Sequence, residues 1–159
     1  MPVKAETFPL ARSGAIEIIQ ATWRDSLLLN QLEKMCFPID SWPLFDIIAA
    51  LTFPNMVRLK AMDDTRLAGF ILGDYRPSEK LAWIASIAVH PGYRGRGIGT
   101  ELLKKCEDQL RAPRVRLSVR ISNESAIHLY KHNGYRVVSN WPNYYKGGED
   151  ALVMEKELR

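Results

Sequence analysis

The chain has few residues of the kinds that cross-link small proteins or hold metal ions. Its 159 residues include only two cysteines, Cys36 and Cys106, and three histidines. Neither cysteine has a second Cys or a His close by in the sequence, so the spacings of a disulfide framework or a C-x-x-C metal site are missing. We therefore predict two buried, reduced thiols and no metal site. A chain of this length buries roughly two-thirds of its unfolded surface and needs no such cross-link.

Long apolar runs are missing as well. The sequence has no stretch of about 18 uncharged apolar residues, which a bilayer-spanning helix would require. Its opening residues lack the apolar core of a signal peptide. We therefore predict a cytoplasmic protein with no membrane partner. The composition, 47% hydrophobic and 25% charged, is that of one globular domain. Residues 1–14 hold two prolines and no apolar period, and we expect a loose arm there before a single domain over 15–159.

Positive charge is concentrated in one part of the chain. Residues 90–146 carry 11 basic and 4 acidic residues, whereas residues 1–89 carry 9 and 10. Such a segment suits nucleic acid, an anionic membrane or a small polyphosphate, and an ordinary solvated surface is the alternative. No aromatic-interleaved patch or recognition motif accompanies the charge, so we expect no nucleic-acid partner.

Hydrophobic periodicity predicts a mixed sheet with helices on its faces, which is an α/β (α+β) fold with the element order βααβββαβαββ. Thr22 and Asp25 form a capping-box-like start for the first helix, and Leu28, Leu32, Met35 and Cys36 are expected on its inner face. The other expected strands are at 15–20, 57–61, 67–75, 81–89, 115–119, 135–139 and 150–157. The other expected helices are one at about 43–51, one that begins at Ile98 and is ended by Pro113, and a short one that ends at Asn133-Gly134.

The most informative segment runs from Ser86 to Thr100 and reads SIAVHPGYRGRGIGT. It combines a nearly continuous apolar strand, a loop rich in Gly and Arg, and a helix start. Free N–H groups and the dipole at a helix start attract anions, and glycines let a phosphate approach the backbone closely. The glycines at 95, 97 and 99 do not fit G-x-G-x-x-G, and the Gly-Lys-Ser/Thr ending of a Walker A loop is missing. A simple glycine-rich turn is the alternative to a phosphate site.

Two motifs in this half of the chain resemble a known family. Arg94-x-x-Gly97-x-Gly99 is similar to the Q/R-x-x-G-x-G/A signature of the GCN5-related N-acetyltransferases (GNAT). About 30 residues later, the segment from Asn123 to Tyr130 followed by Gly134-Tyr135 resembles the second stretch of that family, N-x-x-A-x-x-x-Y before G-F/Y. The resemblance covers about residues 15–158. It implies the GNAT fold, with a mixed, mostly antiparallel sheet of about seven strands, and acetyl-CoA as cofactor.

The resemblance also implies a set of cofactor-binding residues. The strand backbone would lie beside the pantetheine arm, the Gly-Arg loop would hold the pyrophosphate, and Asn123 would lie near the pantetheine amides. An Asn before a helix is often simply its cap, which is the alternative for that residue. The implied residues are Ile87, Ala88, Val89, Arg94, Gly95, Arg96, Gly97, Ile98, Gly99, Thr100 and Asn123.

A narrower likeness concerns the acceptor. The segment 143–151, NYYKGGEDA, is similar to the Y-Y-x-x-G-E-D-A stretch of protein N-terminal acetyltransferases, including the enzymes that acetylate a ribosomal protein. The resemblance implies a protein or peptide N-terminus as acceptor. Four aromatic residues would form its slot, although core packing would explain rings equally well. They are Phe37, Trp42, Tyr144 and Tyr145.

Two residues are the candidate catalytic groups. The counterpart of Tyr130 in the family protonates the departing CoA sulfur, and a ring packed on a helix face is the alternative. Ser118 occupies the strand position at which many N-terminal acetyltransferases carry a Glu or His base, and serine is a poor base at neutral pH. There are three candidates for the proton acceptor. They are a water molecule relayed through Ser118, the carboxylate of Glu149 and, less favourably, His90.

Two alternatives to this function stay open. A small-molecule amine or a lysine side chain is compatible with the same cofactor motif, and a lysine acceptor requires a stronger base than Ser118. The second alternative is an acyl-CoA-binding regulatory module without turnover, for which Ser118 is the best support. The sequence does not indicate an oligomeric state.

Overall fold

The computed structural model describes residues 15–158, and the predicted N-terminal arm over residues 1–14 lies outside that range. The elements follow the predicted order βααβββαβαββ. The strands are β1 (Glu17–Gln20), β2 (Met56–Asp63), β3 (Arg66–Arg76), β4 (Leu81–Val89), β5 (Arg114–Arg120), β6 (Arg136–Trp141) and β7 (Ala151–Glu157). The helices are α1 (Ser26–Cys36), α2 (Leu44–Thr52), α3 (Ile98–Gln109) and α4 (Glu124–His132), with short 3-10 turns at Trp23–Asp25, Pro77–Glu79 and Pro91–Tyr93.

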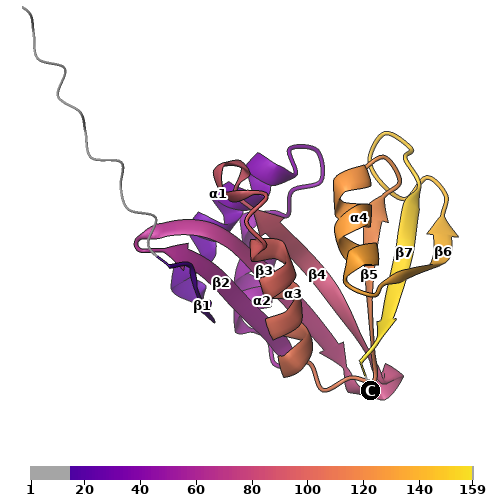
Figure 1. Cartoon of the computed structure of the whole chain (residues 1–159), viewed down its shortest axis with the longest axis horizontal. Coiled ribbons are helices and arrows are strands. Elements are labelled where there is room, and N and C mark those ends of the chain that lie inside the picture. Colours follow the sequence, from indigo (N-terminus) through magenta and orange to yellow (C-terminus); the bar gives the residue numbers. More distant parts are fainter. Residues whose placement is uncertain (1–14, 159) are drawn as a thin grey trace, which may run out of the picture.

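The strands form a single seven-stranded sheet in the order β1-β2-β3-β4-β5-β7-β6. All neighbours are antiparallel except β4 and β5, which are parallel. These two strands pair over three residues only, Leu81–Trp83 with Arg114–Arg116. Figure 1 shows them close together near the C-terminal end of the chain and apart beyond it. The sheet therefore opens in its middle.

Helices cover both faces of the sheet, as predicted. On one face α3 buries Leu102, Leu103 and Cys106 against residues of β2, β3 and β5. On the other face Leu29 of α1 and Ile47 of α2 pack in a second cluster around residues of β3 and β4. The central strand β3 is buried on both faces, so its middle reads as a continuous apolar run.

The inner face of α1 differs from the prediction. Leu32 is buried, but Leu28 and Met35 are 46% and 54% exposed, and Cys36 is only partly buried. The buried stripe runs through positions 29, 32, 33 and 36, which is the i, i+3, i+4, i+7 spacing of a helix. The prediction missed this stripe because one of its members is a charged residue, Glu33, which is 2% exposed.

The predicted capping box holds the start of this helical segment. The backbone N–H of Thr22 donates to the carboxylate of Asp25 at 2.8 Å. That carboxylate also pairs with Lys60 of β2 at 2.7 Å. The cap begins a 3-10 turn that leads into α1, and it anchors the helix start to the sheet.

Three further findings concern residues 15–158 alone. None of their helices combines the length and apolarity needed to cross a bilayer. They contain no group of three or more His, Cys, Asp and Glu side chains placed to hold a metal ion. Both cysteines are free, and Cys106 is buried as predicted.

Candidate active site

The parting of β4 and β5 leaves one edge of β4 facing a gap. Its register with β3 shifts at Ala85, so β4 carries a bulge there. The N–H of His90 donates to the carbonyl of Ala68 at 2.8 Å. Because hydrogen-bonding direction alternates along an antiparallel strand, the N–H and C=O groups of Ile87 and Val89 point away from β3, into the gap. An extended ligand with amide groups can bond to such an edge, where the Val89 carbonyl also accepts a hydrogen bond from Arg94 Nε at 3.2 Å.

The Gly-Arg loop follows directly after β4 and leads into α3. Gly97 precedes the first helical residue with φ +78°, a left-handed conformation that favours glycine. A Cβ built on Gly95 or Gly97 would meet nothing within 4 Å, so their backbone borders open space. The loop is held in place because the Tyr93 hydroxyl donates to Asp63 at 2.6 Å. The first N–H groups of α3 have no partner within the helix and are directed toward this space, as in an anion site.

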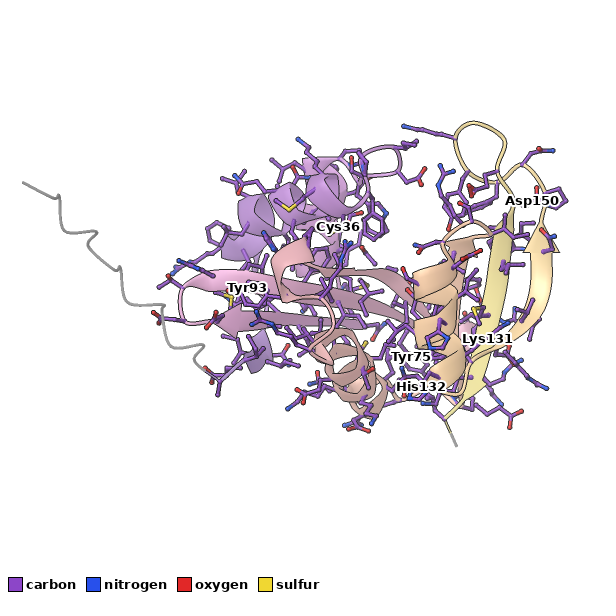
Figure 2. All side chains as sticks on the ribbon, turned by 45° about the horizontal axis from the view of Figure 1, so that its top comes forward. Cys36, Tyr75, Tyr93, Lys131, His132 and Asp150 are labelled. Carbon is purple, nitrogen blue, oxygen red and sulfur yellow. The ribbon has the colours of Figure 1, made fainter. Side chains whose placement is uncertain are left out.

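These features line a cavity of about 870 Å³ between the end of β4, the loop and the starts of α3 and α4. Figure 2 shows two of its lining residues, Cys36 at the end of α1 and His132 at the end of α4. Every predicted cofactor residue lines it except Arg96, whose guanidinium lies over the Tyr93 ring at 5.1 Å. A strand edge for amide groups, a glycine cradle and helix N–H groups for a diphosphate together fit acetyl-CoA.

Asn123 is the N-cap of α4 and also borders the cavities. Its side-chain oxygen accepts the N–H of Ala126 at 3.3 Å and caps α4. The residue also lines the large cavity and a second one beside it.

The second cavity has a volume of about 240 Å³ and lies between the diverging ends of β4 and β5. All four aromatic residues predicted for the acceptor slot line it. Phe37 and Trp42 come from the α1–α2 connection, and Tyr144 and Tyr145 come from the β6–β7 loop. The two cavities meet, because four residues belong to both linings: Phe37, Ile87, Asn123 and Tyr130.

The two predicted catalytic residues lie at or near this junction. Tyr130 is 7% exposed, and burial raises the pKa of its phenol well above the usual value, so the hydroxyl stays protonated at neutral pH. Ser118 lines the smaller cavity and accepts a hydrogen bond from the Tyr145 hydroxyl at 3.2 Å. Burial is also the main reason why the pKa of Tyr145 is raised.

Sequence reasoning missed an ion-pair cluster in the lining of the smaller cavity. The Arg120 guanidinium donates to both carboxylate oxygens of Asp40, at 2.5 and 2.8 Å, and lies 3.4 Å from Glu149. It also donates to the carbonyl of Lys146 at 3.1 Å and lies over the Tyr145 ring at 4.9 Å. Arg120 therefore ties the α1–α2 connection to the β6–β7 loop. No local pattern in the sequence connects positions 40, 120 and 149.

The predicted alternatives for the base are poorly placed. Hydrogen bonds from Ser122, followed by the charge of Arg120, lower the pKa of Glu149, and this residue lines neither cavity. His90 also lines neither cavity, and its Nδ1 accepts the N–H of Gly92 at 3.0 Å. A carboxylate that the sequence reasoning did not consider, Glu33, does line the smaller cavity.

Comparisons with known proteins identify the family. The model of the acetyltransferase (GNAT) family matches residues 21–135. The chain belongs to the GNAT family. It is accordingly an acetyl-CoA-dependent N-acetyltransferase with the GNAT fold, as predicted. It is 30% identical over 155 residues to N-alpha-acetyltransferase 50 of Danio rerio, covering 92% of this chain and 90% of that protein.

Solved structures of other GNAT proteins share the fold. The ribosomal-protein-S18-alanine N-acetyltransferase of Escherichia coli superposes with a TM-score of 0.81 at 24% identity, covering 90% of this chain and 94% of that one. Arabidopsis thaliana NAA60 in complex with acetyl-CoA gives a TM-score of 0.78 at 22% identity, covering 89% and 98%.

Diphosphate binding by the Gly-Arg loop, residues 94–97, can be tested by substituting one glycine of the loop and one glycine elsewhere. Gly97→Glu is expected to weaken acetyl-CoA binding at least tenfold, because the new side chain fills the cradle and its charge repels a diphosphate. Gly147→Glu is the matched control, since Gly147 also has positive φ (+84°) with open space around its Cβ site but lines neither cavity. Isothermal titration calorimetry measures both affinities. Equal affinity in the two variants would contradict the assignment.

Proposed function

We propose that this GNAT enzyme acetylates the α-amine of a protein or peptide N-terminus, by direct attack of the amine in a ternary complex. The smaller cavity, which we call the acceptor cavity, supports this proposal most directly. Its volume of about 240 Å³ and its wall of four aromatic rings suit an amine and one or two side chains rather than a large ligand. Several curated relatives are named N-alpha-acetyltransferases, such as N-alpha-acetyltransferase 50, and these names agree with it.

The chemistry of β5 favours an α-amine over a lysine side chain. An α-amine with a pKa of about 8 is neutral for roughly a quarter of the time at pH 7.5, whereas a lysine amine near 10.4 is neutral about once in a thousand. An α-amine therefore needs little help to reach the neutral form in which it attacks the thioester. Of the β5 residues that line the cavity, Ser118 stands at the position where a base is expected, and a serine supplies only weak assistance.

Each site residue has a role in this reaction. When bound, acetyl-CoA supplies the thioester that the amine attacks. Ile87 and Val89 would hold its amide groups through their backbone, and the segment from Gly95 to Thr100 would hold its diphosphate. The aromatic residues orient the acceptor. Tyr130, kept protonated by burial, is the group that donates a proton to the departing sulfur.

An acceptor panel tests the proposed substrate class. We expect CoA release with peptides that have a free N-terminus, and no release with the same peptides N-acetylated and carrying internal lysines. A thiol-reactive dye measures CoA. Turnover of the blocked lysine peptides, a polyamine or an aminoglycoside would contradict the proposal. Tight acetyl-CoA binding without turnover of any acceptor would instead support a regulatory module.

Tyr130→Phe tests the proposed proton donor. We expect kcat to fall about 100-fold, because general acid catalysis typically contributes that much or more, while acetyl-CoA affinity stays within twofold. Tyr135→Phe is the matched control. Tyr135 is also buried, lies 5.9 Å from Tyr130 between ring centres, and donates to Glu107 without lining either cavity. Steady-state kinetics and calorimetry supply both numbers, and an unchanged kcat in Tyr130→Phe would exclude the role.

Arg120→Gln tests the link between the two loops that flank the acceptor. We expect the acceptor KM to rise roughly fivefold, since a partly exposed ion pair contributes about 1 kcal/mol, and acetyl-CoA affinity to stay unchanged. Arg116→Gln is the control, because Arg116 is on the same strand and pairs with Glu155 at 2.6 Å, away from both cavities. A similar KM in the two variants would show that the loops are held by other contacts.

A further inference from the structure

In the described part of the chain, one carboxylate of the acceptor cavity is buried without a cation beside it. Glu33 lies on the inner face of α1, is 2% exposed and lines the smaller cavity. Within residues 15–158 it has no ion-pair partner. The other carboxylate in the lining, Asp40, is bound by Arg120 through both of its oxygens. Glu33 is therefore the carboxylate of this cavity whose charge no neighbouring cation neutralises.

The hydrogen bonds of Glu33 leave it able to accept more. The Ser86 hydroxyl donates to one carboxylate oxygen at 2.8 Å, and the backbone N–H of Trp42 donates to the other at 3.4 Å. An ionised carboxylate has about four acceptor sites, so two donors do not saturate it. Burial without a cation is costly for a charged group, and such a carboxylate gains from taking up a proton.

Ser86 connects this carboxylate to the place where the two cavities meet. It follows the bulge residue Ala85 and precedes Ile87, whose N–H and C=O face the gap and whose side chain borders both cavities. Ser86 itself lines the acceptor cavity. A hydroxyl that donates to a carboxylate can in turn accept a hydrogen bond from an amine beside it.

The electrostatic surroundings agree with this arrangement. Burial raises the pKa of Glu33, and the hydrogen bonds from Ser86 and Trp42 offset part of that rise. The ionisable groups around it are Cys36 on the same helix and, on the other walls of the cavity, Asp40, Arg120, Tyr130, Tyr144 and Tyr145. A raised pKa brings a carboxylate closer to the operating pH, where a general base is most effective.

We propose that Glu33 is the proton acceptor of the reaction, with the Ser86 hydroxyl as the relay between the attacking amine and the Glu33 carboxylate. As the amine nitrogen forms its bond to the acetyl carbon, its proton passes to the oxygen of Ser86, and the proton of Ser86 passes to Glu33. The carbon–sulfur bond breaks and the sulfur takes its proton from Tyr130. Proton exchange with solvent then removes the proton from Glu33 and returns one to Tyr130. The assignment of Glu33 and Ser86 rests on the proposed acetyl transfer to an amine, but it does not depend on which amine is the acceptor.

Kinetics of Glu33→Gln test the role. We expect kcat to fall about 100-fold while acetyl-CoA affinity stays within twofold of the natural protein. We also expect the rate of this variant to keep rising up to about pH 10, because hydroxide then replaces the lost base. Ser86→Ala is expected to lower kcat about tenfold. Glu107→Gln is the matched control: Glu107 is also buried, with hydrogen bonds from Tyr135 and Lys156, but it lines neither cavity.

Several outcomes would overturn the proposal. A Glu33→Gln variant whose kcat stays within threefold, or whose acceptor KM alone rises, would make Glu33 only a support for the loop that carries Trp42. An unchanged kcat in Ser86→Ala would exclude the relay. The kinetics use whichever class of amine the acceptor panel identifies, so turnover of a small amine would refute the proposed acceptor and leave this test intact. A chain without any turnover would refute both.

A second readout needs no substrate. A carboxyl whose pKa is higher in the folded state than in the unfolded state loses stabilisation as the pH rises from its unfolded value through its folded one. Relative to Glu33→Gln, the natural protein is therefore expected to lose free energy of unfolding as the pH rises above about 4.3. Urea unfolding over pH 4–8 measures this difference. A difference that does not vary with pH would overturn the proposal.

Discussion

The short pairing of β4 and β5 is the constraint on which the site depends. The two strands share three residue pairs and then diverge, yet each keeps a full partner on its other side, β3 for β4 and β7 for β5. The opening therefore removes hydrogen bonds from one edge of each strand without weakening the rest of the sheet. The exposed edge of β4 supplies main-chain groups to a ligand, and the space between the strands supplies a cavity for the acceptor.

Side chains rather than backbone pairing fix the shape of the open end. A row of four rings leads from the paired part of β4 to it: Trp83 and Trp141 at 5.8 Å between centres, then Tyr144 at 5.0 Å and Tyr145 at 5.0 Å, of which the two tyrosines line the cavity. Arg120 continues this row by lying over Tyr145 and reaching Asp40 on the opposite side. Rings have few rotatable bonds, so a wall built from them is rigid at little entropic cost.

The sequence predicted the parts of the site that are local and missed those that are not. The Gly-Arg loop, the capped start of α4 and the element order follow from residues adjacent in the chain, and the structure has them in place. The ion pairs of Arg120 join positions 80 and 29 residues apart, which no local pattern encodes. The short β4–β5 pairing could not be predicted either, because the apolar pattern of a strand does not depend on how many of its residues pair with the neighbouring strand.

Glu33 shows a different limit of pattern reading. A glutamate on a helix is usually solvated. Because Glu33 belongs to the buried stripe at 29, 32, 33 and 36, the prediction placed Leu28 and Met35 on the buried face of α1 instead. A polar residue on an apolar helical face breaks the ordinary hydrophobic period. Such breaks occur where a side chain is retained for a site rather than for packing.

The two cavities share Phe37, Ile87, Asn123 and Tyr130, and this common wall has a thermodynamic consequence. A ligand that fills one cavity completes the enclosure of the other and excludes water from it. Donor and acceptor therefore contribute to each other's affinity, and linkage requires the two effects to be equal in factor, whichever molecule arrives first.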